Sequence, residues 1–239
     1  MREAIKNRIS RRTFEKEHID IQKRTTIITW INNINKLSGL TIQYIDDGSE
    51  AFKSMKKSYG MFKNVRSVIL MKGLKTDINL KEKIGYYGEE LILDITDLGL
   101  GTCWVAGTFD ESVFNIENEE EELICVVPVG VIKSTTIKEK AVRSIIHRKV
   151  KGIEERVISD CDLPQWAMKG MEAVLLAPSA INTQKAKFIF KDNQMRAEII
   201  NDYKCDMIDL GIAKKHFEIE AGGIFELGNG GQFNHIPKN

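Results

Sequence analysis

A short segment near the start of the sequence gathers cationic and hydroxyl side chains that could bind an anion. Arg8, Ser10 and Arg12 alternate with other residues before Phe14, directly after a predicted helix over Arg2–Ile9. Planar guanidinium groups donate forked hydrogen bonds, which suit a phosphate group or the carbonyl edge of a ring such as a flavin. A solvated basic turn is the other interpretation of the same residues.

A second candidate segment, Pro178–Gln184, reads Pro-Ser-Ala-Ile-Asn-Thr-Gln and stands between a predicted helix and a predicted strand. The amide of Asn182 can donate and accept hydrogen bonds at once, and this matches a ring edge that alternates carbonyl and N–H groups. An ordinary helix stop that uses Pro178 and Ser179 is the alternative interpretation.

A third candidate segment, Gly99–Gly107, is rich in small residues, which let a backbone approach a flat cofactor closely. It is no dinucleotide fingerprint, because the G-x-G-x-x-G spacing is absent and the glycines close a helix instead of opening one. Cys103 lies within it, but the sequence shows no histidine positioned to activate a nucleophile. We therefore expect Cys103 to be a packed thiol.

Several classes of protein are disfavoured by what the sequence lacks. The four histidines show no ligand spacing with one another or with the cysteines, so we expect no metal site. No G-x-S-x-G or P-loop pattern occurs. The four cysteines form no C-x-x-C pair, and we interpret them as reduced thiols.

Charge and hydropathy point to a cytoplasmic protein. The 35 lysines and arginines almost balance 34 aspartates and glutamates, giving a net charge of +1, so nothing recommends nucleic acid or an anionic membrane as partner. The uncharged stretch Leu98–Phe109 is shorter than the roughly 18 residues that span a bilayer. The charged start, Met1–Lys6, is not typical of a signal peptide.

Hydrophobic periodicity predicts the elements that must position these segments. Gly99 should end the helix at its C′ position, and the acidic run Glu117–Glu122 should be a solvated surface. Asp162 should cap the helix that has Pro164 in its first turn. The predicted helices are Arg2–Ile9, Ile21–Leu37, Ile84–Leu98, Leu163–Leu175 and Met207–Ala221, and the predicted strands are Leu40–Ile45, Val65–Met71, Leu123–Ile132 and Lys187–Phe190.

The order of these elements suggests a weak internal repeat. Each half runs basic segment, helix, strand, helix, and each long helix stops at glycines. Gly85 and Gly211, which open the two long helices, are the best anchors of the repeat. Chance similarity between helix-rich segments is the alternative. The repeat predicts a first half over residues 1–135 and a second over 136–239, joined in one integrated unit.

In combination and in order, the three segments resemble the FMN-dependent nitroreductase family. Ala4–Phe14 resembles the opening helix and R-x-S-x-R segment of that family, and Ile84–Trp104 resembles its central helix and the turn after it. Pro178–Gln184 resembles its P-S-x-x-N-x-Q loop. The resemblance implies an α+β, nitroreductase-like fold.

The order departs from ordinary members in one respect, because their P-S-x-x-N loop follows soon after the first motif. Here only Lys36–Leu40 stands at that place. The displacement matches a subgroup in which one chain holds two shortened, half-size α/β repeats that fold together like the dimer of ordinary members. The resemblance therefore implies a pseudo-dimer within one chain, either monomeric or a weak homodimer, in which both halves supply one FMN site.

The resemblance also implies roles for individual residues. Arg8 and Ser10, with Ile9 between them, would hold the FMN phosphate and ribityl chain, and Arg12 would lie near the pyrimidine edge. The Ala106-Gly107 backbone would lie by the flavin N5, and the basic pair Arg148-Lys149, with Arg143 in reserve, would bind the phosphate. The loop would contribute Pro178, Ser179, Asn182 and Gln184 from the other half.

The implied activity is a two-step reaction. NAD(P)H reduces the flavin, and a nitroaromatic, quinone or similar small oxidant then takes the electrons. No side chain is expected to be catalytic, because the flavin carries the chemistry. The alternatives are a flavin-binding protein with a degenerate site and no turnover, and a related flavin activity such as dehalogenation or flavin breakdown.

Overall fold

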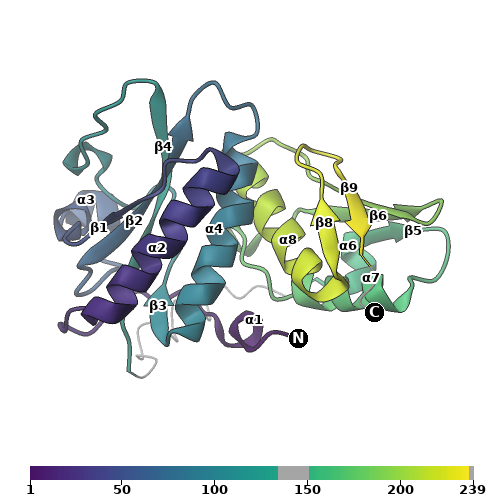
Figure 1. Ribbon diagram of the computed structural model, residues 1–239, viewed down its shortest axis with the longest axis horizontal. Coiled ribbons are helices and arrows are strands. Elements are labelled where there is room, and N and C mark those ends of the chain that lie inside the picture. The colour runs from purple at the N-terminus through teal and green to yellow at the C-terminus, as the bar shows by residue number, and fades with distance from the viewer. Residues whose placement is uncertain (134–150, 237–239) are drawn as a thin grey trace. The chain divides into compact units, whose positions relative to one another are not determined.

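The computed structural model describes residues 1–133 and 151–236, and combines helices with two largely antiparallel sheets (Figure 1). The α+β class predicted from the sequence is confirmed. The chain divides into two units. Unit 1 consists of Met1–Lys6, Lys81–Glu90 and Ser144–Asn239, and unit 2 of Asn7–Leu80 and Leu91–Arg143. In the described ranges, no helix is long and apolar enough to cross a membrane.

The sheet of unit 2 has four antiparallel strands in the order β1-β2-β4-β3. The bounds are β1 Gln43–Ile45, β2 Ser67–Leu74, β3 Leu100–Thr102 and β4 Glu121–Val131. Strand β2 is buried on both faces, as its run of apolar residues predicts, and Ile69 lies opposite Val127 of β4. The remaining elements of unit 2 are α2 Ile21–Ser38, η1 Ser49–Phe52, α3 Met55–Ser58 and η2 Glu111–Val113.

Helix α4 (Leu80–Asp97) is continuous, and the segment Lys81–Glu90 belongs to unit 1 while Leu91–Asp97 belongs to unit 2. Gly99 follows the C-cap residue with a φ of 75°, and its N–H donates to the carbonyl of Thr96 at 2.9 Å. The prediction that Gly99 is the C′ residue is confirmed, because glycine takes the left-handed conformation there without strain.

Unit 1 contains a five-stranded sheet in the order β5-β6-β7-β9-β8. Its elements are α6 Ile153–Arg156, β5 Val157–Ser159, α7 Gln165–Val174, η3 Ala180–Asn182, β6 Lys187–Lys191, β7 Gln194–Glu198, α8 Asp206–Ala221, β8 Gly223–Phe225 and β9 Gln232–His235. The short helix α1 (Glu3–Asn7) precedes Arg8. Strand β5 pairs with β6 in parallel, and the other pairs are antiparallel.

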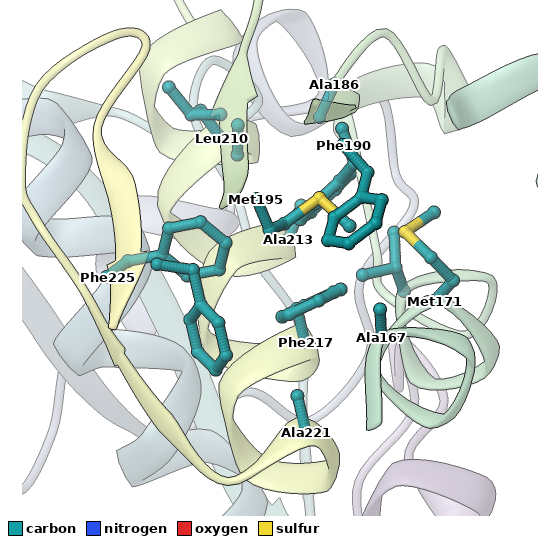
Figure 2. Close-up of a cluster of buried hydrophobic side chains, with 14 of the residues drawn as sticks. Ala167, Met171, Ala186, Phe190, Met195, Leu210, Ala213, Phe217, Ala221 and Phe225 are labelled. Atoms are coloured by element: carbon teal, nitrogen blue, oxygen red, sulfur yellow. The ribbon is translucent and has the colours of Figure 1, made fainter. Parts of the chain in front are cut away.

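The core of unit 1 is strongly aromatic (Figure 2). Phe217 of α8 stacks on Phe188 of β6 with ring centroids 5.1 Å apart, and meets Phe225 and Phe233 edge-on at 5.5 and 5.0 Å. Edge-to-face and offset contacts are the favoured geometries of aromatic pairs. These contacts anchor α8, so its side chains have fixed positions relative to the sheet of unit 1.

One expectation about local structure is wrong, and another holds for all but one of its residues. Asp162 does not cap α7, because Pro164 itself is the N-cap residue, in an extended conformation, and its carbonyl accepts from the N–H of Met168 at 3.0 Å. Proline disfavours helical geometry in the residue before it, so the helix begins after Pro164. The acidic run Glu117–Glu122 is exposed as predicted except at Glu121, which is partly buried because it opens β4 and is ion-paired with Lys72 across the sheet.

Within unit 1, α4 and α8 contact each other at the two glycines that anchor the repeat. A Cβ on Gly85 would lie 2.0 Å from the carbonyl oxygen of Ile208, and a Cβ on Gly211 would lie 2.1 Å from that of Glu82. In each case the partner helix offers the carbonyl three residues before its own glycine. Such reciprocity is typical of a two-fold contact, and it is consistent with the internal repeat, whose boundary near residue 135 stays a prediction.

One ion pair and one histidine–carboxyl contact are fully buried between α4 and α8. Lys214 Nζ lies 2.5 Å from Glu82 Oε1, and His216 Nε2 lies 2.9 Å from Glu89 Oε1. The other ring nitrogen of His216, Nδ1, donates to the carbonyl of Ala173 at 3.1 Å. Each of these four side chains has no exposed surface. The charges of Lys214 and Glu82 therefore depend on one another, because a buried charge without a partner is strongly destabilising.

Candidate functional site

The basic segment of unit 2 is held against the sheet by isolated β-bridges. Ser10 forms a parallel bridge with Thr102 of β3, and the N–H of Arg11 donates to the Thr102 carbonyl at 2.8 Å. Phe14 is buried, and a Cβ on Gly130 would come within 2.9 Å of its ring. The backbone of this segment is therefore fixed by hydrogen bonds to the sheet, which does not fit the interpretation as a solvated turn. Arg8, Ser10 and Arg12 are each partly buried.

The glycine-rich segment reaches the same part of unit 2. Val105 forms two backbone hydrogen bonds with Val126 of β4, at 3.0 and 2.9 Å, directly before Ala106 and Gly107. Ala106 is partly buried and Gly107 is exposed. Cys103 is packed in the core of unit 2, as predicted. The structure thus brings two of the three sequence motifs to one strand, because Ser10 bridges Thr102 only four residues before Ala106.

The third motif forms a strained loop in unit 1. Ile181, Asn182 and Gln184 have φ values of 52°, 55° and 50°, a region that a β-branched residue such as Ile181 rarely adopts. The loop is closed by the N–H of Gln184, which donates to Ser179 Oγ at 3.0 Å, and by the Gln184 side chain, which donates to Asn182 Oδ1 at 3.1 Å. Strained backbone of this kind is concentrated at binding sites.

The amide nitrogen of Asn182 is the group in this loop that fits a ligand. Its oxygen accepts from Gln184, but Nδ2 is buried and meets no hydrogen-bond partner within residues 1–133 and 151–236. A buried N–H without a partner is costly, so its presence needs an explanation. A carbonyl or ring nitrogen of a bound cofactor would supply the acceptor, and the side chain is therefore compatible with the flavin edge expected from the sequence.

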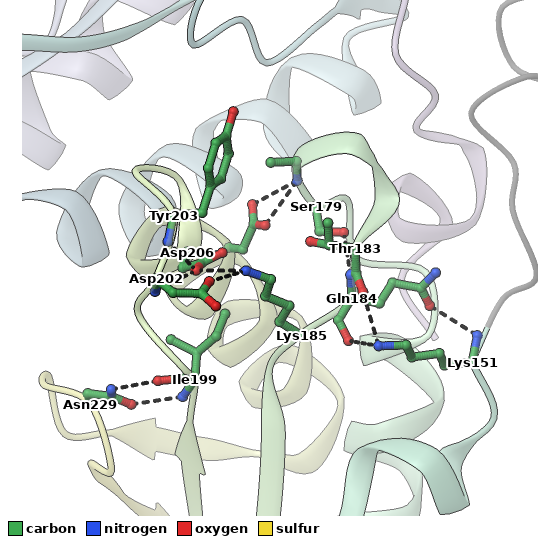
Figure 3. Close-up of polar contacts among 12 residues, drawn as sticks. Lys151, Ser179, Thr183, Gln184, Lys185, Ile199, Asp202, Tyr203, Asp206 and Asn229 are labelled. Atoms are coloured by element: carbon green, nitrogen blue, oxygen red, sulfur yellow. Dashed lines mark hydrogen bonds and ion pairs between the residues drawn. The ribbon is translucent and has the colours of Figure 1, made fainter.

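Lys151 and Asp209 fix the loop from outside. The N–H of Lys151 donates to Gln184 Oε1 at 3.2 Å, and its Nζ donates to the carbonyl of Thr183 at 3.1 Å (Figure 3). From α8, both carboxylate oxygens of Asp209 accept from the N–H of Ala180, each at 3.0 Å. The sequence motifs did not identify Asp209. The available signal was an acidic residue between the apolar Ile208 and Leu210 on a predicted helix.

The carboxyl group of Asp209 has an unusual affinity for protons. Burial raises its pKa from the ordinary 3.8 to about 7. The hydrogen bond from the Ala180 N–H opposes this rise, and the negative charge of the nearby Asp206 adds to it. Lys185 and Arg156 also oppose the rise. Burial in turn lowers the pKa of Arg156 to about 10, and its guanidinium donates to the carbonyl of Val174 at 2.8 Å.

This pKa predicts how Asp209 affects stability. Because the folded-state pKa lies above the unfolded value, the group stabilises the fold fully below about pH 4 and loses that contribution as the pH rises to about 7. Between pH 5 and pH 8, the free energy of unfolding of the Asp209→Asn variant should therefore rise relative to that of the wild type by at most about 3 kcal/mol. Urea unfolding at the two pH values measures the gain. The exposed Asp160→Asn variant is the control, and an equal gain there would contradict the prediction.

The remaining candidates fall outside the structure that can be described. Arg143, Arg148 and Lys149 lie outside residues 1–133 and 151–236, so their proposed contact with the phosphate stays a prediction. Within those ranges, no group of three or more histidine, cysteine, aspartate or glutamate residues could hold a metal ion.

Comparison with solved structures identifies the fold. The chain is similar to a putative nitroreductase from Thermotoga maritima MSB8, with a TM-score of 0.62, 20% identity, and coverage of 97% of this chain and 90% of that one. An FMN-dependent nitroreductase from Clostridium difficile R20291 (TM-score 0.46, 16% identity) aligns over 56% of this chain and 88% of its own. A nitroreductase with bound FMN from Bacteroides fragilis NCTC 9343 (0.41, 14%) covers 56% and 92%. The nitroreductase fold predicted from the motifs is confirmed.

The family follows from the sequence as a whole. A family model described as Putative TM nitroreductase matches residues 1–221, and the chain belongs to that family. Membership places the chain among oxidoreductases. Comparison with curated proteins finds no match.

Proposed function

We propose that this protein is an FMN-dependent oxidoreductase that takes electrons from NAD(P)H and passes them to a nitroaromatic, a quinone or a similar small oxidant. The observation that carries the proposal is the buried Asn182 Nδ2, which meets no partner in the described part of the chain. It lies in the loop that matches the P-S-x-x-N-x-Q motif, in a chain that belongs to a nitroreductase family.

The residues of unit 2 fit one end of such a cofactor. Arg8 and Ser10 are proposed to bind the phosphate and ribityl groups, since guanidinium and hydroxyl groups are good partners for both. Arg12 is proposed to lie near the pyrimidine edge, where a cation favours the anionic reduced flavin. The backbone of Ala106 and Gly107 is proposed to lie near N5. The bridge between Ser10 and Thr102 supports the grouping, because it fixes both segments on one sheet.

The loop of unit 1 is proposed to recognise the ring. Asn182 would donate to a ring acceptor through Nδ2, while Gln184 holds its Oδ1 and so fixes the orientation of the amide. Pro178 and Ser179 precede the turn, and Ser179 Oγ is already engaged by the N–H of Gln184. When bound, FMN supplies the hydride and electron chemistry, and these side chains bind and orient it.

Enzymatic turnover distinguishes this proposal from its main alternative, a flavin-binding protein with a degenerate site. The sequence contains one complete set of motifs, so both readings expect one flavin per chain. The enzyme should oxidise NADH or NADPH faster when FMN and a quinone or nitroaromatic are present. Flavin binding without any oxidation would support the alternative.

Loss of either motif should weaken FMN binding. The Arg8→Ala and Asn182→Ala variants should each raise the dissociation constant of FMN at least about tenfold, because each removes a hydrogen bond to a buried or charged partner. Quenching of flavin fluorescence measures the constant. Arg66→Ala and Asn201→Ala change exposed residues of the same types and should leave it unaltered. Unchanged affinity in both Arg8→Ala and Asn182→Ala would refute the two-motif site.

A further inference from the structure

The carboxylate of Asp209 is a buried charge with one evident task. Its side chain is 5% exposed, and both of its oxygens accept from the N–H of Ala180. Within the described ranges this N–H is the one hydrogen-bond donor to the Asp209 side chain. A charge buried in this way without a cation in contact is unfavourable for stability. A buried titratable group of this kind is therefore a candidate for a functional role.

Ala180 is the residue at which the strained turn begins. It is the first residue of η3, and Ile181 and Asn182 follow it directly with positive φ values. The bonds of Lys151 reach the loop at Thr183 and Gln184, on the other side of Asn182. Asp209 is thus the anchor on the N-terminal side of the turn, and without it the strain at Ile181 could relax and carry Asn182 away.

We propose that Asp209 is a positioning residue that holds the Ala180–Gln184 loop in its ligand-binding conformation, and that protonation of its carboxyl group loosens the loop. The inference rests on the proposed FMN function of Asn182 and adds to it a dependence on pH. Asp209 acts through the backbone of Ala180 and needs no contact with the cofactor itself.

The charges around Asp209 make this anchor sensitive to pH. Asp206 lies on the same helix, and the cations Lys185 and Arg156 approach from the segment before β6 and from α6. Neither cation is bonded to Asp209, because Lys185 pairs with Asp202 and Asp206 and Arg156 donates to Val174. The thiol of Cys205 and the phenol of Tyr203 are also close enough to interact electrostatically with Asp209.

Protonation near pH 7 changes what the carboxyl group can do. The ionised group offers two equivalent acceptor oxygens to the Ala180 N–H, and hydrogen bonds to an ionised acceptor are the stronger ones. The protonated group keeps one carbonyl oxygen and turns the other into a donor. The anchor should consequently weaken as the pH falls through the pKa of about 7.

The amide resonance of Ala180 in the flavin-free protein tests the anchor without any cofactor. In ¹⁵N-labelled wild-type protein its chemical shift should change with a midpoint near pH 7, as the carboxylate it contacts is protonated. The same titration should persist in Asp160→Asn and vanish in Asp209→Asn. An Ala180 resonance that does not titrate in the wild type would overturn the proposal, and this part of the experiment requires no variant.

Flavin titrations at pH 6 and pH 8 test the consequence for binding. The FMN phosphate also ionises in this range, so the relevant quantity is the change in affinity of the wild type relative to Asp209→Asn. From pH 6 to pH 8, the FMN affinity of the wild type should rise about fivefold or more relative to that of Asp209→Asn. An equal change in both proteins would overturn the proposal while leaving FMN binding intact. If the wild type binds no FMN, the proposed function fails, and the Ala180 titration alone decides whether Asp209 anchors the loop.

Discussion

The Gly211→Ala variant is expected to lose at least about 3 kcal/mol in free energy of unfolding, in the range of the larger single-site effects. Its new methyl group would lie 2.1 Å from the Glu82 carbonyl oxygen and 2.7 Å from the Tyr86 nitrogen. Both are backbone atoms of α4, so no side-chain rotation can relieve the overlap. At a site with open space, the same change inside a helix would stabilise by about 0.5–1 kcal/mol. A loss of stability in Gly211→Ala would therefore indicate close contact between α4 and α8, and a gain would indicate open space.

Two further variants complete this test. Gly85→Ala should be as damaging as Gly211→Ala, because its methyl group would lie 2.0 Å from the Ile208 carbonyl oxygen. Gly39→Ala is the control, since no atom lies within 4 Å of its Cβ position and only the left-handed backbone, with φ of 73°, disfavours alanine. It should lose about 1–2 kcal/mol. Urea unfolding of all three gives the comparison, and wild-type stability of Gly211→Ala would contradict the close approach of α4 and α8.

The Lys214→Met variant is expected to lose about 3–5 kcal/mol, because it leaves the buried carboxylate of Glu82 without its cation. Lys214 Nζ also donates to the carbonyls of Glu226 and Gly228, at 3.0 and 2.8 Å. Glu82 Oε2 accepts from the N–H of Gly228 at 2.6 Å. One pair of charges therefore holds α4, α8 and the turn between β8 and β9 within unit 1.

A double variant tests whether the loss of stability comes from the isolated charge of Glu82. Replacing both residues, as Glu82→Met with Lys214→Met, removes the two charges together, and pairs replaced in this way are often neutral or even stabilised. The double variant should recover most of the stability that Lys214→Met loses. Thermal or urea unfolding measures it. A double variant as unstable as the sum of the two single variants would show that the two side chains act independently.

The sequence predicted the long helices well, because their apolar residues recur with a helical period over many turns. Helix α2 and helix α8 begin and end within one residue of their predicted limits. The repeated order of the elements singled out Gly85 and Gly211. The structure shows that the backbone of the partner helix occupies the space that a side chain at either position would need. Sequence alone could not show this, because the helix contact joins residues more than a hundred positions apart.

The short elements of unit 1 were not predicted. Strands β5, β8 and β9 have three, three and four residues, too few for an alternating pattern to be distinguished from a loop. They are stabilised by pairing with neighbouring strands and by the aromatic core around Phe217. Tertiary packing decides their conformation, so local propensity carries little information about them.

The sequence predicted only those residues of the candidate site that belong to recognisable motifs. Arg8, Ser10 and Asn182 belong to recurring patterns of residues. The structure adds backbone detail that the sequence could not show, namely the bridge from Ser10 to β3 and the strained turn at η3. Asp209 belongs to no such pattern. Its importance depends on burial and on a bond to Ala180, and these arise only when α8 and the loop are folded together.

The central proposal is that the chain binds one FMN and uses it to oxidise NAD(P)H. Titration of flavin-free protein with FMN, followed by fluorescence and by the visible spectrum, tests it most directly. We predict saturation at one equivalent per chain, with a flavin band that bleaches when NADH or NADPH is added without oxygen. Absence of saturable FMN binding by the protein would contradict the account.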